Sequence, residues 1–421
     1  MRPEAGLRRE LGTFDAVMTG LAAMVGAGVF AAFAPAADAA GSGLLLALGI
    51  AAVVAYCNAA SSARLAARYP ASGGTYVYGR ERLGPFWGHL AGWGFVVGKT
   101  ASCAAMALVV GAYAAPGHER VVAVAAVLVL TVVNCLGVRK TAWATRAIVA
   151  VVLLVLVAVC VATWSGGSPR APWAADAAAT EVTFGGVLQA AGLLFFAFAG
   201  YARIATLGEE VRDPQRTIPR AIPLALGIVL VVYAAVGAAA LAALGPGALA
   251  EAGAPLADTV RAADAQWLVP VVRVGAALAA LGSLLTLLVG VSRTTLAMAR
   301  DRHLPGALAV VHARTATPYR AELAVGAVAA LAAATVDLRG AIGFSSFGVL
   351  VYYAIAGASA WTLSPAEGRP PRLVPALGIV GCAALACTLP ATSAVAGAAV
   401  LAAGALAYGV RARWARRGGT G

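Results

Sequence analysis

Long apolar runs, interrupted only by short polar segments, are the feature of this sequence that most restricts its fold. A transmembrane helix needs about 20 consecutive, mostly apolar residues to cross the hydrocarbon core of a bilayer. An extended backbone cannot cross lipid with its polar groups unpaired, so the runs are predicted to be helices. The twelve predicted spans are 14–37, 44–66, 85–113, 120–137, 145–164, 187–211, 221–244, 268–298, 321–336, 340–362, 373–389 and 391–409.

The composition agrees with this interpretation. Hydrophobic residues make up 61% of the chain and charged residues only 12%. Soluble domains usually carry roughly a quarter of their residues as charged side chains. The composition therefore excludes a soluble enzyme, a disordered regulator and a small disulfide-stabilised scaffold.

The net charge of +13 would also fit a nucleic-acid-binding protein, so the placement of the basic residues decides its meaning. With the N-terminus inside, 23 of the 31 Lys and Arg residues fall on one face of the membrane, in clusters at 2–9, 64–82, 139–146, 212–220, 300–320, 369–372 and 411–417. The opposite face keeps Arg120, Arg170, Arg261 and Arg339. This asymmetry predicts a multi-pass protein of the plasma membrane with both termini in the cytoplasm and no nucleic-acid partner.

The sequence offers little on which to build an enzyme or a metal site. All six cysteines lie in apolar stretches without metal-ligand spacing, and the four histidines are scattered. We find no zinc-protease, serine-hydrolase or phosphate-loop motif. We therefore expect no catalytic residues, no metal and no cofactor.

The first and sixth predicted spans are both interrupted by glycine. Gly26-Ala27-Gly28 lies in the middle of span 1, and Gly200 follows an aromatic run in span 6. Glycine is a poor helix former and allows the backbone to open. The two spans run in opposite directions, as expected of an inverted repeat whose broken helices meet at the membrane midplane. The alternative is that these glycines only allow close helix packing.

The broken helices predict the chemistry of a ligand. The second half of span 1 would begin with free N–H groups, which suit a carboxylate. The first half of span 6 would end with free carbonyls near Phe196 to Phe198, which suit an ammonium group. A small molecule that carries both groups is an α-amino acid.

The sequence resembles the amino acid–polyamine–organocation (APC) superfamily of secondary transporters over nearly the whole chain. The resemblance rests on four segments in the order and topology of that family: Gly26–Phe30, Tyr69–Tyr76, Phe195–Gly200 with Glu209–Arg220, and Ser292–Pro305. It implies an all-α polytopic membrane protein with twelve helices, in which helices 1 and 6 are discontinuous. The implied organisation is a LeuT-like five-plus-five inverted repeat, with residues 1–164 forming the first repeat and residues 184–336 with 340–362 the second. Two extra helices would cover 373–409, and the whole chain, 1–421, would be one transporter domain.

The resemblance also implies roles for individual residues. Backbone N–H groups at Val25, Gly26, Ala27 and Gly28 would bind the substrate carboxylate, and carbonyls at Phe196, Ala197 and Phe198 its amine. Gly200 would keep the helix 6 break open. The Tyr69–Tyr76 and Glu209–Arg220 loops would either frame a cytoplasmic gate or be solvated turns. Asp15 could pair with Arg203 or Arg293.

Lys99, in span 3, departs from the family pattern. Many proton-coupled members carry a lysine in helix 5, whereas the interior of span 5 here contains none. An ammonium group in the membrane interior is costly and is usually paired, functional or snorkelling. We predict that Lys99 takes part in proton coupling or replaces a coupling cation, with Ser283 and Thr286 contributing to an ion site. The alternatives are pairing with carbonyls and snorkelling, and Ser or Thr at such depth often bonds its own helix.

Arg203 lies one turn past the helix 6 break, where it would face the substrate or pair with another group. No Asp or Glu lies deep in any predicted span. A neutral amino acid is therefore favoured as substrate, and an acidic one is also electrostatically acceptable. The alternatives are a cationic amino acid or polyamine exchanger, and a non-transporting amino acid sensor, although few residues remain outside the spans for an output domain. The sequence does not separate proton symport, exchange with a counter-substrate and uniport, and it leaves the oligomeric state open.

Overall fold

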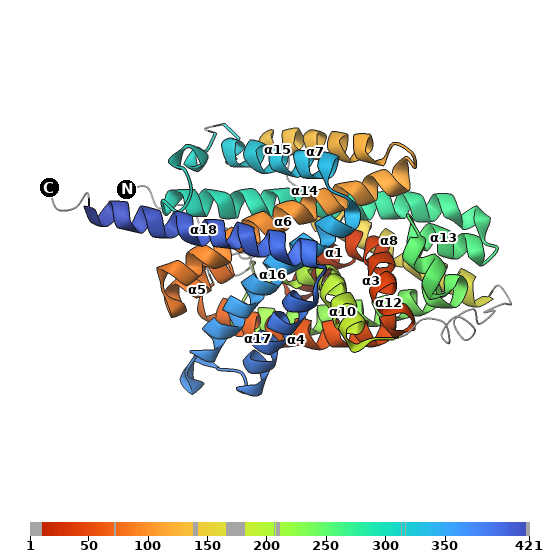
Figure 1. Ribbon diagram of the computed structural model, residues 1–421, viewed down its shortest axis with the longest axis horizontal. Coiled ribbons are helices and arrows are strands. Elements are labelled where there is room, and N and C mark those ends of the chain that lie inside the picture. Colours follow the sequence, from red (N-terminus) through yellow and green to blue (C-terminus); the bar gives the residue numbers. More distant parts are fainter. Residues whose placement is uncertain are drawn as a thin grey trace.

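A computed structural model describes residues 11–70, 73–137, 142–165, 182–205, 207, 211–312, 314–315 and 317–417. The described residues form helices joined by short connections, with one isolated bridge between Leu11 and Val211. Figure 1 shows α6 (Pro85–Ala114), α14 (Val269–Arg300) and α18 (Ala391–Arg417) running roughly along the long axis of the molecule, whereas α16 (Leu338–Trp361) and α17 (Leu373–Thr388) are steeply inclined to it.

The first half of the chain contains the first broken helix and four long ones. Its α-helices are α1 (Thr13–Met24), α2 (Ala27–Ala31), α3 (Phe33–Ala40), α4 (Leu44–Arg68), α5 (Thr75–Leu83), α6 (Pro85–Ala114), α7 (Glu119–Cys135) and α8 (Ala142–Ser165). A 3₁₀ turn at Gly41–Gly43 joins α3 to α4.

The second half begins with the other broken helix. Its α-helices are α10 (Phe184–Phe198), α11 (Ala202–Ala205), α12 (Pro214–Glu251), α13 (Pro255–Ala262), α14 (Val269–Arg300), α15 (Tyr319–Thr335), α16 (Leu338–Trp361), α17 (Leu373–Thr388) and α18 (Ala391–Arg417). Four 3₁₀ turns lie at Ala199–Tyr201, Gln266–Leu268, Gly306–Ala309 and Pro365–Glu367.

Every predicted span coincides with a helix or a broken helix. Among the described residues, nine helices are long and apolar enough to cross a membrane. Three helices are shorter: α7 and α15 have 17 residues each and α17 has 16. The all-helical polytopic fold is therefore confirmed, whereas the count of twelve crossings and the inverted repeat stay predictions.

The two breaks lie where glycine interrupts the apolar pattern. α1 ends at Met24, and the backbone leaves the helix at Val25 (ψ 37°) and Gly26 (ψ −133°) before α2 begins. The second break is tighter, because α10 passes through the 3₁₀ turn Ala199–Tyr201 directly into α11. Helix 6 is therefore bent at Gly200 and not opened into an extended segment.

Small residues allow the central helices to approach closely. A Cβ atom at Gly98 of α6 would lie 3.3 Å from the Cα atom of Gly348 on α16. Close contact of this kind is the usual basis of helix association in lipid, where burial of apolar surface gives little driving force. Here it places α6 in the centre of the bundle, beside α14 and α16 (Figure 1).

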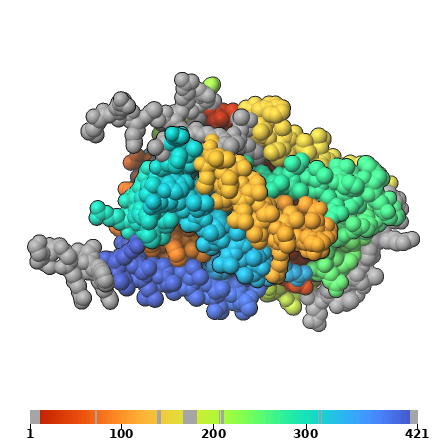
Figure 2. Space-filling view, turned by 90° about the horizontal axis from the view of Figure 1, so that it is seen from above, coloured from red at the N-terminus to blue at the C-terminus, as the bar shows by residue number. Residues whose placement is uncertain are grey.

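The outer surface carries the apolar side chains that lipid would cover. α7 and α15 lie side by side on one face of the molecule, and α18 runs along its edge (Figure 2). Their exposed residues include Val121 and Val129 of α7, Leu331 of α15 and Leu406 of α18. A soluble monomer rarely exposes continuous apolar surface on this scale.

Candidate substrate site

A cavity of about 170 Å³ lies between the two helix breaks and the central helices α6 and α14. It extends from the breaks toward the end of the bundle that carries α5, which we call the α5 end. The lining residues come from six places in the fold: Ala23 on α1; Gly73 before α5; Phe95, Lys99, Ser102 and Met106 on α6; Phe196, Ala199, Gly200, Ala202 and Arg203 around the helix 6 break; Ser283, Thr286, Leu287, Gly290, Arg293, Thr294 and Ala297 on α14; and Tyr352 on α16.

Half of the predicted site residues line this cavity. These are Lys99, Phe196, Gly200, Arg203, Ser283 and Thr286. The other half, which do not line it, are Val25, Gly26, Ala27, Gly28, Ala197 and Phe198. The structure thus brings the predicted coupling residues together with the helix 6 break, whereas the start of α2 is covered.

The covering of α2 has a steric cause. A Cβ atom at Gly26 would lie 2.0 Å from Oγ of Ser283, and one at Gly28 would lie 2.7 Å from Cα of Ala197. In this conformation both glycines therefore allow close helix packing, which is the alternative to ligand binding that the sequence leaves open. The first N–H groups of α2 still lack acceptors within their own helix, as at any helix start.

Two tyrosines hold the broken helices in place, and sequence analysis did not identify either. The hydroxyl of Tyr233, on α12, lies 2.5 Å from the carbonyl oxygen of Met24 and 3.2 Å from that of Ala197. The hydroxyl of Tyr353, on α16, donates to the carbonyl of Ala199 at 2.9 Å. The carbonyl of Ala197, predicted to bind a substrate amine, is therefore contacted by Tyr233 in this conformation.

The predicted ion-site residues make backbone contacts. Ser283 Oγ donates to the carbonyl of Ala22 at 3.2 Å, which ties α14 to α1 just before the break. Thr286 Oγ1 instead donates to the carbonyls of Gly282 and Ser283 in its own helix. Only Ser283 thus links two elements of the site.

The charges around the cavity are all positive. Lys99, Arg203 and Arg293 are lining residues, and the described lining contains no Asp or Glu. The side chain of Lys99 is 7% exposed. Among the described residues, the Lys99 ammonium makes no hydrogen bond or ion pair.

One buried carboxylate lies nearby but outside the lining. Glu322, in the first turn of α15, is 2% exposed and accepts a hydrogen bond from Ser292 Oγ at 2.7 Å. Ser292 and the lining residue Arg293 are neighbours on α14. Glu322 is the second residue of the predicted span 321–336, and the packing of α15 against α14 and α7 buries it.

A second cavity, of about 600 Å³, lies at the opposite end of the bundle, which carries α13. The hydroxyl of Tyr113, on α6, donates to the carbonyl of Phe30 at 3.0 Å and accepts from the backbone N–H of Leu256 at 3.2 Å. The Phe30 and Tyr113 rings pack edge to face, with their centroids 5.7 Å apart. Tyr113 therefore joins α2, α6 and α13 at this end.

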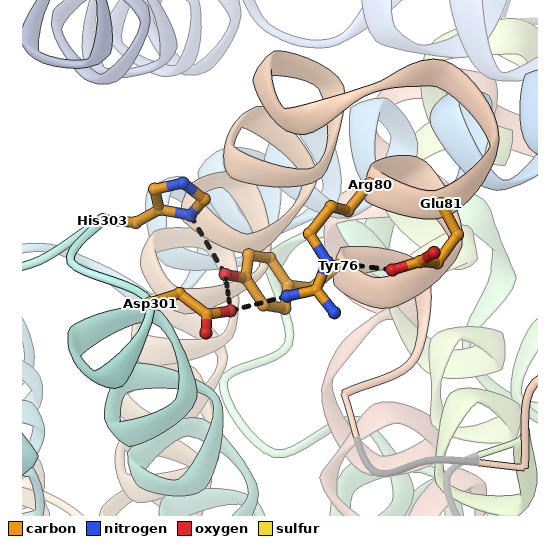
Figure 3. A network of polar contacts seen from close by, with 5 residues as sticks. All are labelled: Tyr76, Arg80, Glu81, Asp301 and His303. Carbon is orange, nitrogen blue, oxygen red and sulfur yellow. Dashed lines mark hydrogen bonds and ion pairs between the residues drawn. The ribbon is translucent and has the colours of Figure 1, made fainter. Parts of the chain in front are cut away.

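The α5 end is held by a polar cluster, Tyr76, Arg80, Asp301 and His303, which we call the α5 clasp (Figure 3). The Tyr76 hydroxyl donates to Asp301 Oδ2 at 2.5 Å and lies 3.0 Å from His303 Nδ1. Arg80 Nη1 donates to the same Asp301 oxygen at 2.8 Å. Burial, and then the bond to Asp301, raises the pKa of Tyr76, so the phenol keeps the proton that it donates.

Removing the Tyr76 hydroxyl should weaken the α5 clasp. A hydrogen bond to a charged group contributes about 1.5–3 kcal/mol, and the partial exposure of Asp301 reduces that to about 1 kcal/mol here. We expect Tyr76→Phe to lower the melting temperature of the detergent-purified protein. Tyr78→Phe is the matched control, because the Tyr78 hydroxyl is buried on the same helix with no partner among the described residues. Equal losses in the two variants would contradict a specific role for the Tyr76 bond.

The structure corrects the predicted pairing of Asp15. Its carboxylate forms an ion pair with Arg146 on α8, not with Arg203 or Arg293. Asp15 also accepts a hydrogen bond from the N–H of Gly12, which caps α1. The pairing follows from the packing of α1 beside α8, which the sequence does not show.

Of the two predicted gate loops, residues 71–72 and 209–210 lie outside the described residues.

Helical spacing could have identified several missed lining residues. Phe95, Ser102 and Met106 are four residues before, three after and seven after Lys99, so they share its face of α6. The same rule extends the Ser283 face of α14 to Leu287 and Gly290. Tyr233, Tyr353 and Tyr352 carry no such signal, because their helices reach the site only through packing.

Comparison with known proteins places this architecture in a family. The sequence matches the family described as amino acid permease over residues 11–407. An uncharacterized transporter of Mycobacterium tuberculosis is 68% identical over 98% of this chain and 93% of its own length. The branched-chain amino acid permease BcaP of Bacillus subtilis is 26% identical over 90% of this chain and 88% of its own length. Human cationic amino acid transporter 4 is 30% identical over 87% of this chain and 62% of its own length.

Proposed function

Because this chain belongs to the amino acid permease family, we propose that it is a secondary transporter that moves an amino acid across the plasma membrane by alternating access. The observation that carries the proposal is the cavity between the two broken helices, which extends toward the α5 end, while Tyr113 joins α2 to its neighbours at the α13 end. A transporter needs such a site with access from one side at a time. The positive-inside distribution supports a cytoplasmic α5 end, with both termini on that side.

The architecture that we propose keeps twelve crossings in a five-plus-five inverted repeat with two additional helices. α7, α15 and α17 then cross the membrane despite their length, with local thinning of the bilayer or snorkelling of flanking residues. The substrate carboxylate binds N–H groups from Val25 to Gly28 and its amine binds carbonyls of Phe196 to Phe198, once the α1 and α10 breaks move apart. Gly200 allows the two breaks to approach closely in the present conformation, because it packs against the backbone of Ala23.

Charge in the cavity favours a neutral substrate over a cationic one. The Lys99 ammonium, which forms no ion pair with the described residues, would repel a lysine, arginine or polyamine in a region of low dielectric constant. Relatives named as cationic amino acid transporters make that class the alternative. We propose that Lys99, with Ser283 and Thr286, takes part in coupling to protons or replaces a coupling cation.

Counterflow in proteoliposomes tests the function. Vesicles loaded with an unlabelled neutral amino acid should accumulate the labelled one above the level of protein-free vesicles, and an inward proton gradient should raise the uptake. Preferential counterflow of lysine or arginine would replace the neutral substrate with the cationic alternative. Absence of counterflow with every amino acid tested would contradict the transport proposal.

A further inference from the structure

Lys99 is a charge without compensation in the described structure. Its side chain is 93% buried, since 7% remains exposed, and that remainder lines the cavity. The described residues supply it with no hydrogen bond and no ion pair, and the only titratable group that interacts with it is the Cys103 thiol one turn along α6. Burying an isolated ammonium group is unfavourable unless a partner neutralises it.

The groups around Lys99 cannot supply that partner. Arg293 on α14 and Arg203 on α11 are cations, and Tyr352 on α16 and Cys103 on α6 are neutral when protonated. The buried carboxylate of Glu322 interacts with Ser292 and Arg293 and lies outside the lining. A zwitterionic amino acid would add no net charge, so the Lys99 ammonium would still lack a counter-charge.

The cavity does contain hydrogen-bond donors suited to an anion. Ser102 lies one turn from Lys99 on the same face of α6, and its hydroxyl is 2.5 Å from that of Ser345 on α16. The Ser102 hydroxyl also lies 3.3 Å from the carbonyl oxygen of Gly98, to which it donates. If Ser345 donates to Ser102, the Ser102 proton can exchange this long bond for one to a ligand in the cavity. An ammonium group with neighbouring hydroxyls is a chemically suitable site for a carboxylate or a halide.

We propose that the loaded cavity holds a negative charge beside Lys99 and Ser102, in addition to the α-carboxylate of the amino acid. This proposal rests on the proposed transport function and adds to it a second ligand group. The charge comes either from the side-chain carboxylate of an acidic substrate or from an inorganic anion, for which chloride is the probe. A bound anion and a protonated Lys99 stabilise each other, so anion binding and proton uptake are thermodynamically linked.

Transport of two isosteric substrates in two salts separates the sources. Wild-type proteoliposomes are assayed with labelled L-glutamate and L-glutamine, each in chloride and in gluconate buffer. Counterflow of glutamate about tenfold above glutamine in both salts assigns the charge to the substrate side chain. If glutamine counterflow is about tenfold lower in gluconate than in chloride, the negative charge is assigned to a bound chloride ion. Counterflow of glutamine or lysine that is the same in both salts, with no preference for glutamate, overturns the anion site and leaves the transport proposal intact.

A binding measurement keeps the anion site testable even if no transport is detected. We expect glutamate or chloride, but not gluconate, to raise the melting temperature of the detergent-purified wild-type protein. Lys99→Gln should fold, because it removes a buried charge, and should lose the shift. Lys99→Arg should keep the shift in melting temperature. The control Arg320→Gln, which removes an exposed positive charge outside the cavity, should keep it as well. No shift in the wild type, or an equal shift in Lys99→Gln, would refute the anion site.

Discussion

Gly200→Ala should reduce amino acid counterflow by about fivefold to a hundredfold, because the new methyl group would have no room at the helix 6 break. An ideal Cβ atom at this position lies 2.5 Å from both the carbonyl carbon and the oxygen of Ala23. The obstacle is backbone, so no flexible side chain can move aside. Overpacking of this kind costs about 1–3 kcal/mol, and 1.4 kcal/mol corresponds to a factor of ten.

The measurement is initial counterflow per reconstituted protein, together with the melting temperature in detergent. Gly227→Ala is the matched control, since Gly227 lies within α12 and a Cβ atom there meets nothing within 4 Å. That control should transport normally and gain up to about 1 kcal/mol from helix propensity. Normal transport by Gly200→Ala would mean that close approach of the two breaks is unnecessary.

Tyr233→Phe is the second substitution with a large expected effect. The hydroxyl contacts two buried carbonyl oxygens at the ends of α1 and α10. Leaving buried acceptors without their donor costs about 1–3 kcal/mol, so we expect a clear loss of thermal stability. In the variant the Ala197 carbonyl is no longer occupied by the Tyr233 hydroxyl. If this carbonyl receives the substrate amine, the substrate should bind more tightly and KM should fall about three- to tenfold. The maximal rate should also fall, because the substrate is released more slowly.

The split between KM and maximal rate distinguishes this role from a purely structural one. A tyrosine that only stabilises the bundle would lower the amount of folded protein and leave KM unchanged. Tyr56→Phe serves as the control, because Tyr56 is 52% exposed on the outer surface of α4. An unchanged KM in Tyr233→Phe would contradict the proposed competition between the hydroxyl and the substrate amine.

Much of the fold could be predicted from the sequence because hydropathy is a local property of the chain. Each apolar run long enough to cross a bilayer corresponds to a helix, with ends that differ by a few residues in most cases. The largest differences occur at the start of α12, which begins at Pro214, and at the end of α18, which continues to Arg417. Near its other end α12 leaves helical geometry at Gly245 (φ 71°, ψ 167°), next to the predicted end of the span at residue 244. Polar residues at helix ends do not stop a helix once it extends out of the apolar region.

The site was predictable only in part. Lys99 can be identified from the sequence because a charged residue stands out in an apolar run. The positions of the two breaks can be identified because glycine interrupts the same kind of run. Tyr233 and Tyr353 were missed because tyrosine within an apolar helix gives no sign of which backbone its hydroxyl will reach. Gly26 and Gly28 were assigned to ligand binding, yet in this conformation they face Ser283 and Ala197.

The sequence by itself therefore determined the helical membrane fold, the two points at which helices break and the rarity of charges inside the bundle. Only the tertiary structure decided which of these features meet. It placed Lys99 and Ser102 opposite the α14 face that carries Arg293, paired Asp15 with Arg146, and buried Glu322 beside Ser292. The physical reason is that hydropathy and glycine act along neighbouring residues, whereas a binding site requires contacts between helices separated by long stretches of chain.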